Sequence, residues 1–107
     1  MTNPFRNETT ILIKGESKVL RPTFSVMVEI ESEFGPLSKL FAKIEGGELT
    51  FAAAKTILAL GLKGGGNPVS NEDLDEAIEE IGFAGIGTAV VTFLMSSVHG
   101  GQKIKKN

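Results

Sequence analysis

The segment Val19–Phe24, which reads Val-Leu-Arg-Pro-Thr-Phe, constrains the fold of this chain more than any other. Pro22 has no N–H to donate to a strand ladder, and its fixed φ suits the first turn of a helix. The hydroxyl of Thr23 can accept an N–H of that turn. Further on, Gly35–Pro36 is a typical helix stop signal. We therefore predict a strand that passes directly into a helix, which ends before Gly35.

The residues ahead of this junction predict a β-hairpin. Thr9–Lys14 is rich in β-branched and apolar residues, Gly15–Glu16 is a turn signal, and Ser17–Leu20 can return as a second strand. An isolated two-stranded hairpin is marginally stable in water, so it must pack on helices, pair with another chain, or both. Packing alone is the commoner outcome. The alternative is a subunit interface along one strand edge, with Ile11 and Ile13 as candidate partner contacts.

Two successive helices are predicted next. The first, Thr23–Phe34, has an imperfect apolar face, and its expected inner positions are Phe24, Met27, Val28, Ile30 or Glu31, and Phe34. Pro36 opens the second, whose apolar residues at i, i+3, i+4 and i+7 form one clean stripe. That stripe consists of Leu37, Leu40, Phe41 and Ile44. Gly46–Gly47 is expected to end this helix.

A third helix is predicted from Phe51 to about Leu62, with Thr50 as its N-cap. Its expected inner residues are Phe51, Ala54, Ile57, Leu58 and Leu62. The glycine run Gly64–Gly66 follows. A phosphate-binding loop would continue with Lys and Ser or Thr, whereas here Asn67–Pro68 follows, so we expect a flexible connector.

Two further helices are predicted on either side of Gly82. Ser70 and Asp73 resemble a capping box for the first of them, whose carboxylates form a solvated face or, less commonly, a docking surface for a basic partner. The last helix, Phe83–Val98, is apolar nearly all round, which is typical of a central helix. It spans about 24 Å at roughly 1.5 Å per residue, short of the ~30 Å hydrocarbon core, so we expect a core helix and no membrane span. Gly85 and Gly87 within this helix predict close approach of another helix.

Together these segments predict a mostly helical α+β fold, in which an N-terminal β-hairpin is followed by a bundle of about five short helices. The 107 residues suit a single domain, with an ordered core from about residue 8 to residue 99. Hydrophobic residues make up 41% and charged residues 22%, which is ordinary for a globular protein.

Composition narrows the classes of function. The formal net charge is -2 and only Lys103–Lys106 forms a basic cluster, which disfavours nucleic-acid binding. With no cysteine, no disulfide or thiolate site is expected. The single histidine, His99, suits a helix C-terminus better than a catalytic or metal site. We assign no catalytic, cofactor-binding or metal-binding residue. The polar segment Met1–Glu8 lacks the features of a secretory signal, so we expect a cytoplasmic protein.

The order and spacing of several short motifs resemble the gene transfer agent family of phage-like tail proteins. These motifs are Leu20–Phe24, Glu29–Glu31, Phe34–Gly35, Leu37–Phe41 and Glu48–Thr50, followed by the acidic helix and the apolar helix from Gly82. The resemblance covers roughly residues 10–98 and includes no catalytic signature.

The resemblance implies a non-enzymatic protein of phage-like tail morphogenesis. Family members look like tail assembly chaperones, which bind the tape-measure protein and help recruit tail-tube subunits, and the family is also labelled a tail-tube family. Known tail tubes are built from β-rich subunits, so a mostly helical chain favours the chaperone over a tube component retained in the particle. A homo-oligomer through the hairpin is a further alternative. An enzyme is disfavoured because the sequence offers few candidate catalytic side chains. A DNA-binding bundle is disfavoured because its helices lack a basic recognition face.

A chaperone of this kind would shield an apolar helical segment of the tape-measure protein, and the apolar stripes supply candidate contacts. These candidates are Leu37, Leu40, Phe41, Ile44, Phe51 and Leu58. Packing in the protein core is the commoner role for residues in such stripes. Their exposure in the folded chain therefore decides which of them remain available to a partner.

Overall fold

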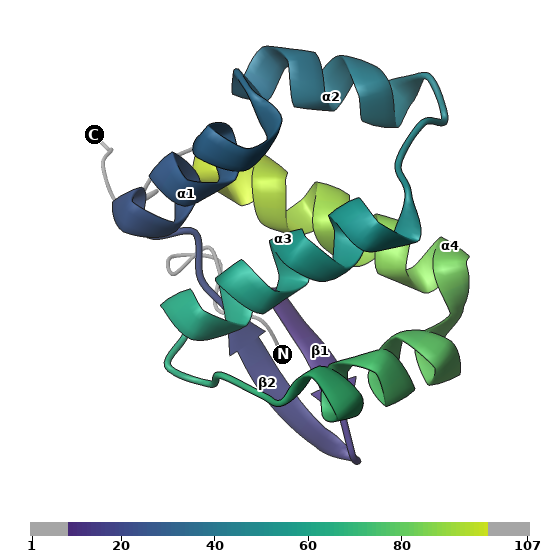
Figure 1. Ribbon diagram of the computed structural model, residues 1–107. Coiled ribbons are helices and arrows are strands. Elements are labelled where there is room, and N and C mark those ends of the chain that lie inside the picture. The colour runs from purple at the N-terminus through teal and green to yellow at the C-terminus, as the bar shows by residue number, and fades with distance from the viewer. Residues whose placement is uncertain (1–8, 99–107) are drawn as a thin grey trace, which may run out of the picture.

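The computed structural model describes residues 9–98, and the segments 1–8 and 99–107 lie outside the described part. Within residues 9–98 the chain forms a hairpin followed by four helices (Figure 1). The elements are β1 (Thr9–Ile13), β2 (Glu16–Leu20), α1 (Phe24–Phe34), α2 (Leu37–Glu45), α3 (Phe51–Gly64) and α4 (Asn71–Val98). The predicted α+β class and the order of its elements are confirmed.

The hairpin closes one residue earlier than the sequence suggested. Ile13 pairs with Glu16, so the two-residue turn is Lys14–Gly15. Both turn residues have positive φ, 54° at Lys14 and 77° at Gly15, as the right-handed strand twist favours. The predicted turn at Gly15–Glu16 is therefore wrong by one position, because the non-glycine Lys14 adopts the left-handed conformation. In this register β1 alternates, with Thr9, Ile11 and Ile13 inward.

The helix starts are capped by hydroxyl side chains at the positions that the sequence indicated. Thr23 Oγ1 accepts the N–H of Val26 at 3.2 Å, and Thr50 Oγ1 accepts that of Ala53 at 3.0 Å. Pro36 has no side-chain group that could cap α2. Instead, Glu31 Oε2 reaches from α1 and accepts the N–H of Leu37 at 3.0 Å, which ties the two short helices together.

Four helices are delimited where the sequence predicted about five, because α4 spans Gly82, at which two helical segments meet at a kink. Gly82 itself is not helical, with φ 85° and ψ 159°. This backbone region is essentially restricted to glycine. The two predicted helices therefore exist as two arms of α4, which we call the acidic arm (71–81) and the apolar arm (83–98), and Gly82 sets the angle between them.

The core lies where α3, the apolar arm of α4 and the hairpin meet. In Figure 1 α3 crosses in front of the apolar arm, while α2 lies at the end of the molecule remote from the hairpin. β1 packs against α4 and β2 packs against α3. The largest fully buried side chains are Phe93, Leu20, Ile30, Ile57, Leu58, Leu62, Leu74, Ile86, Leu94 and Val90.

Several expected inner positions point outward instead. Phe24 is 85% exposed and Val28 is also exposed, whereas Val26 is buried together with Ile30. Val26 and Ile30 are separated by one helical turn, so they define the inner face of α1. The expected inner positions Met27 and Phe34 are partly buried against the core, so the prediction is wrong only at Phe24 and Val28. Phe51, at the first position of α3, is exposed as well.

Glycines mark close contacts between backbone segments at the end of α3, and not a flexible connector. A Cβ on Gly64 would run into the carbonyl oxygen of Arg21, and one on Gly65 into that of Val19. Nearby, the N–H of Arg21 donates to the carbonyl of Gly61 at 3.0 Å. The strand–helix junction that dominates the sequence is thus held directly against the last turn of α3.

The predicted close helix approach at Gly85 and Gly87 is wrong. A Cβ on Gly87 would meet nothing within 4 Å, and one on Gly85 would meet only the Ile81 side chain of its own helix. The tight helix–helix contact is at Gly61 of α3, where an added Cβ would lie 3.1 Å from the ring of Phe93. A small residue at that point lets the aromatic ring sit against the helix backbone.

Helix α4 also has the length and hydropathy that would allow it to cross a membrane, as judged by these two properties alone. Core helices of globular proteins share both properties. Ile86, Val90, Phe93 and Leu94 on its apolar arm are fully buried within the fold. This packing accounts for one side of the arm. Its other side has no comparable cover among the described residues.

Candidate protein-binding surface

The side of the apolar arm that faces away from the core carries three of the exposed large hydrophobic residues among the described residues. Phe83, Met95 and Val98 are 43%, 40% and 55% exposed. The ring of Phe83 meets that of Phe51 at the start of α3, with centroids 4.7 Å apart and an edge-to-face angle of 62°. Contiguous exposed apolar surface commonly marks an interaction site. This side of α4 is therefore the candidate protein-binding surface.

A first depression, the α2–α4 groove, lies between the end of α2 and the apolar arm. It has a volume of about 410 Å³. Its lining consists of Ile44, Gly47, Leu49, Phe83, Ala84, Gly87, Thr88, Val91 and Thr92. None of these side chains is charged. The absence of a Cβ at Gly87 leaves open space at the groove wall, since nothing in the fold would contact a side chain there.

A second depression, the β1–α4 groove, runs between the edge of β1 and the same arm. It has a volume of about 470 Å³. Its lining consists of Thr9, Thr10, Ile11, Leu12, Ile81, Gly85, Thr88, Ala89 and Thr92. Thr88 and Thr92 belong to both grooves and form the ridge between them. The apolar arm thus separates two uncharged grooves.

Thr9 in the β1–α4 groove has a buried hydroxyl, and its residue is 9% exposed. Its Oγ1 has no hydrogen-bond partner among the described residues. A buried polar group left without a partner costs about 1–3 kcal/mol. This position therefore favours the approach of a group that could donate to, or accept from, the hydroxyl.

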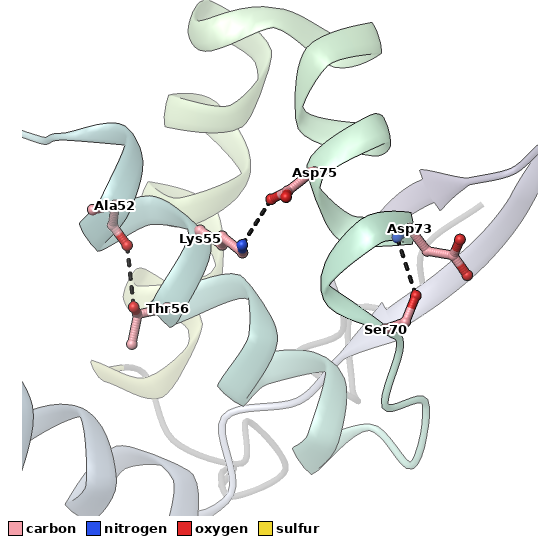
Figure 2. Close-up of polar contacts among 6 residues, drawn as sticks. All are labelled: Ala52, Lys55, Thr56, Ser70, Asp73 and Asp75. Carbon is pink, nitrogen blue, oxygen red and sulfur yellow. Dashed lines mark hydrogen bonds and ion pairs between the residues drawn. The ribbon is translucent and has the colours of Figure 1, made fainter.

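The charged side chains of the acidic arm hold it to its neighbours. Lys55 of α3 reaches Asp75 at 2.7 Å, as Figure 2 shows. Lys14 at the hairpin turn reaches Asp73 at 3.1 Å. The N–H of Asp73 donates to Ser70 Oγ at 3.1 Å, which confirms the capping role of Ser70 (Figure 2). Two of the carboxylates considered as a solvated face or a docking surface are thus paired within the fold.

The shifted pKa values lie at the hairpin turn and not in the grooves. The hydrogen bond and charge of Asp73 raise the pKa of Lys14 above its usual value of 10.5. The hydrogen bond and charge of Lys18 lower the pKa of Glu16 below its usual value of 4.5. Both groups are exposed, and their partners are the ordinary opposite charges of ion pairs. These shifts reflect local pairing.

The predicted partner contacts divide into two sets. Four are buried in the core, with Ile11 6%, Ile13 3%, Leu40 4% and Leu58 0% exposed. Ile11 nevertheless lines the β1–α4 groove, whereas Ile13, Leu40 and Leu58 line neither groove and could meet a partner only after rearrangement. Leu37, Phe41 and Ile44 are partly buried against the core, and Phe51 is exposed. Of these four, Ile44 lines the α2–α4 groove.

Sequence reasoning missed the central residues of the surface, namely Phe83, Gly87, Val91 and Met95. The signal that could have found them is the apolar character of 83–98 on all sides. A helix that packs against the core on just one side leaves its opposite, apolar side exposed. His99 and Lys103–Lys106 lie outside the described residues. Within residues 9–98, no group of three or more His, Cys, Asp or Glu side chains could hold a metal ion.

Comparison with protein families gives a match over most of the chain. The family model described as phage tail tube protein, GTA-gp10, matches residues 6–100. Comparisons with curated proteins and with solved structures gave no match. The family match confirms the resemblance to phage-like tail proteins that the short motifs indicated.

Proposed function

The chain belongs to the family of phage tail tube protein, GTA-gp10, and on that premise we propose that it is a tail assembly chaperone. In this role it has no enzymatic activity. It binds the tape-measure protein and recruits tail-tube subunits in the cytoplasm of the bacterial host. The observation that carries the proposal is the uncharged α2–α4 groove beside the exposed side of the apolar arm.

This groove has the chemistry that an apolar helix of a partner requires. Amphipathic helices bind in hydrophobic grooves through residues at i, i+3, i+4 and i+7. Ile44, Leu49 and Val91 offer aliphatic walls, and Phe83 lies at the same site. Exposed apolar surface is a liability in a free protein, but a chaperone needs such a surface to shield an unassembled partner.

A tube component retained in the particle is the second candidate function, and the description of the family as a phage tail tube protein favours it. Two features of the fold weigh against it. Within residues 9–98 the only sheet has two strands, and most described residues are helical. Known tail tubes are built from β-rich subunits. A tube made of this chain would have to obtain its β-structure by pairing hairpins between subunits.

Coexpression of the chain with tape-measure and tail-tube proteins tests the proposed chaperone role. If the chain has this role, we expect a complex that purifies intact and a larger soluble fraction of the tape-measure protein. A Cβ at Gly87 meets no atom within 4 Å, so Gly87→Leu adds a side chain on the wall of the α2–α4 groove and should weaken that complex by about tenfold or more. Ala59→Leu adds the same side chain at an exposed position of α3 outside both grooves and serves as the matched control.

Equal binding by Gly87→Leu and the wild-type chain, with unchanged thermal stability, would exclude the α2–α4 groove as the binding site. If no complex forms at all, the proposed chaperone role is contradicted. Mass spectrometry of purified particles separates the two candidates, because a chaperone is absent from finished tails and a tube component is present in many copies.

A further inference from the structure

We infer that the chain forms a two-fold symmetric dimer in which β1 of one copy pairs antiparallel with β1 of a second copy. The β1–α4 groove receives the second strand, and the two hairpins become one four-stranded sheet. This inference concerns a different surface from the α2–α4 groove. It does not rest on the proposed function, because a dimer could assemble with or without a tape-measure partner.

The backbone of β1 has an open edge. In a hairpin closed by a two-residue turn, the pair next to the turn exchanges both hydrogen bonds, and bonded and non-bonded pairs then alternate. Ile13, Ile11 and Thr9 are therefore bonded to β2, while the N–H and C=O groups of Thr10 and Leu12 point away from it. Within residues 9–98, neither residue has a backbone hydrogen bond to another element.

By contrast, the outer edge of β2 is covered by another part of the fold. At its end, β2 lies against the last turn of α3, where Gly65 approaches the carbonyl of Val19. Just past the strand, the N–H of Arg21 donates to Gly61. The two edges of the hairpin are therefore unequal, and β1 offers the one at which a strand can be added.

A two-fold axis through Ile11 uses all the outward groups of β1. It places Thr10 of one copy opposite Leu12 of the other, and the reverse pair on the far side of the axis. Since both residues have outward N–H and C=O groups, each of these pairs can exchange two hydrogen bonds. The strand pairs with itself without an unmatched group between Thr10 and Leu12.

Charge favours a second copy in this antiparallel arrangement. Neither β1 nor the β1–α4 groove carries a charged side chain, so neither opposes an identical strand. Lys14 follows β1 in the sequence. The antiparallel register keeps the two Lys14 ammonium groups at opposite ends of the paired strands, whereas parallel pairing would bring them together.

The groove beside β1 has room for this partner. An axis perpendicular to the sheet keeps both α4 helices on the same side of the four-stranded sheet, so their groove-lining sides face one another. Gly85, Thr88, Ala89 and Thr92 on that side are small, which permits two helices to approach closely. The buried Thr9 hydroxyl, which lacks a partner among the described residues, lines the same groove.

Sedimentation equilibrium or light scattering over a range of concentrations measures the dimer. Leu12→Pro removes an outward N–H of β1 and leaves the ladder to β2 intact, so it should weaken dimerisation by about tenfold or more. Ser17→Pro is the matched control, since Ser17 pairs with Leu12 and its N–H points to the opposite edge. The control should dimerise like the wild-type chain.

Cysteine cross-linking reads the register and does not depend on proline being tolerated. The natural chain has no cysteine, so introduced thiols report only the designed contacts. A mixture of Thr10→Cys and Leu12→Cys chains should form a disulfide-linked dimer on mild oxidation, and a mixture of Ser17→Cys and Val19→Cys chains should not.

A monomeric wild-type chain at high concentration would overturn the inference. So would a dimer that Leu12→Pro leaves unchanged and that the cysteine pair fails to link, because its interface would lie elsewhere. Binding of an unrelated extended peptide to the monomer would identify a foreign strand as the occupant and would also overturn it.

Discussion

At the scale of the residue, glycine has two opposite roles in this chain. Gly65 is packed against the backbone of Val19, so its missing Cβ is a requirement of the fold. Gly87 faces open space at the α2–α4 groove, so its missing Cβ is not required by any contact within the fold. The sequence alone shows the same letter at both positions. The difference arises from what lies opposite each glycine after folding.

We therefore predict opposite effects of alanine at these two positions. Gly65→Ala should destabilise the protein by about 1–3 kcal/mol, because a backbone carbonyl cannot move as a flexible side chain does. Gly87→Ala should stabilise it by about 0.5–1 kcal/mol, because alanine is the better helix former and meets no neighbour. Denaturant unfolding followed by circular dichroism measures both. Equal effects of the two substitutions would show that the packing of Gly65 on Val19 is wrong.

At the scale of the element, α4 consists of two helical arms that meet at a kink at Gly82. Gly82 has a conformation that other residues adopt only with strain, and no neighbouring atom lies within 4 Å of the position of a Cβ. The bend lets the acidic arm reach Lys55 of α3 and Lys14 of the hairpin, while the apolar arm enters the core. A straight helix could not make both sets of contacts.

Gly82→Ala tests this bend without adding a steric clash. The substitution should cost about 1–3 kcal/mol of stability, since its only penalty is the backbone conformation. Gly87→Ala in the regular part of the same helix serves as the control. Thermal unfolding gives the cost, and hydrogen exchange locates it, with faster exchange expected in the acidic arm. An unchanged melting temperature would mean that α4 is not bent at this residue in solution.

At the scale of the whole molecule, the hairpin is part of the core, so it should unfold with the helices. Leu20 is fully buried, and an added Cβ on Gly61 of α3 would lie 3.2 Å from it, so the strand end is packed under that helix. Leu12 on the other strand is 58% exposed. The two leucines have the same side chain and different surroundings.

Leu20→Ala should destabilise the whole fold by about 2–5 kcal/mol, whereas Leu12→Ala should change its stability by less than about 0.5 kcal/mol. Measurements are made at a concentration where the chain is monomeric, so that dimerisation does not contribute. For both variants, the loss of helical ellipticity and the loss of hydrogen-exchange protection in the hairpin should occur in the same unfolding transition. A hairpin that melts before the helices would contradict its place in the core.

The sequence determined the order of the elements, because their starts and ends are local. Pro22, Thr23 and Thr50 act through atoms a few residues away, and each helix start that they predict is confirmed. The order and spacing of short motifs also indicated the family, because both can be read from the sequence without knowing the tertiary contacts.

Only the tertiary structure decided which apolar residues are available to a partner. Leu40 and Leu58 are buried while Phe51 and Phe83 are exposed, although all four are large hydrophobic residues at helical positions. Burial depends on what packs opposite each side chain, and those neighbours come from distant parts of the chain. The segment 83–98, which is apolar nearly all round, illustrates the limit, since its periodicity cannot show which side faces the core and which side forms the grooves.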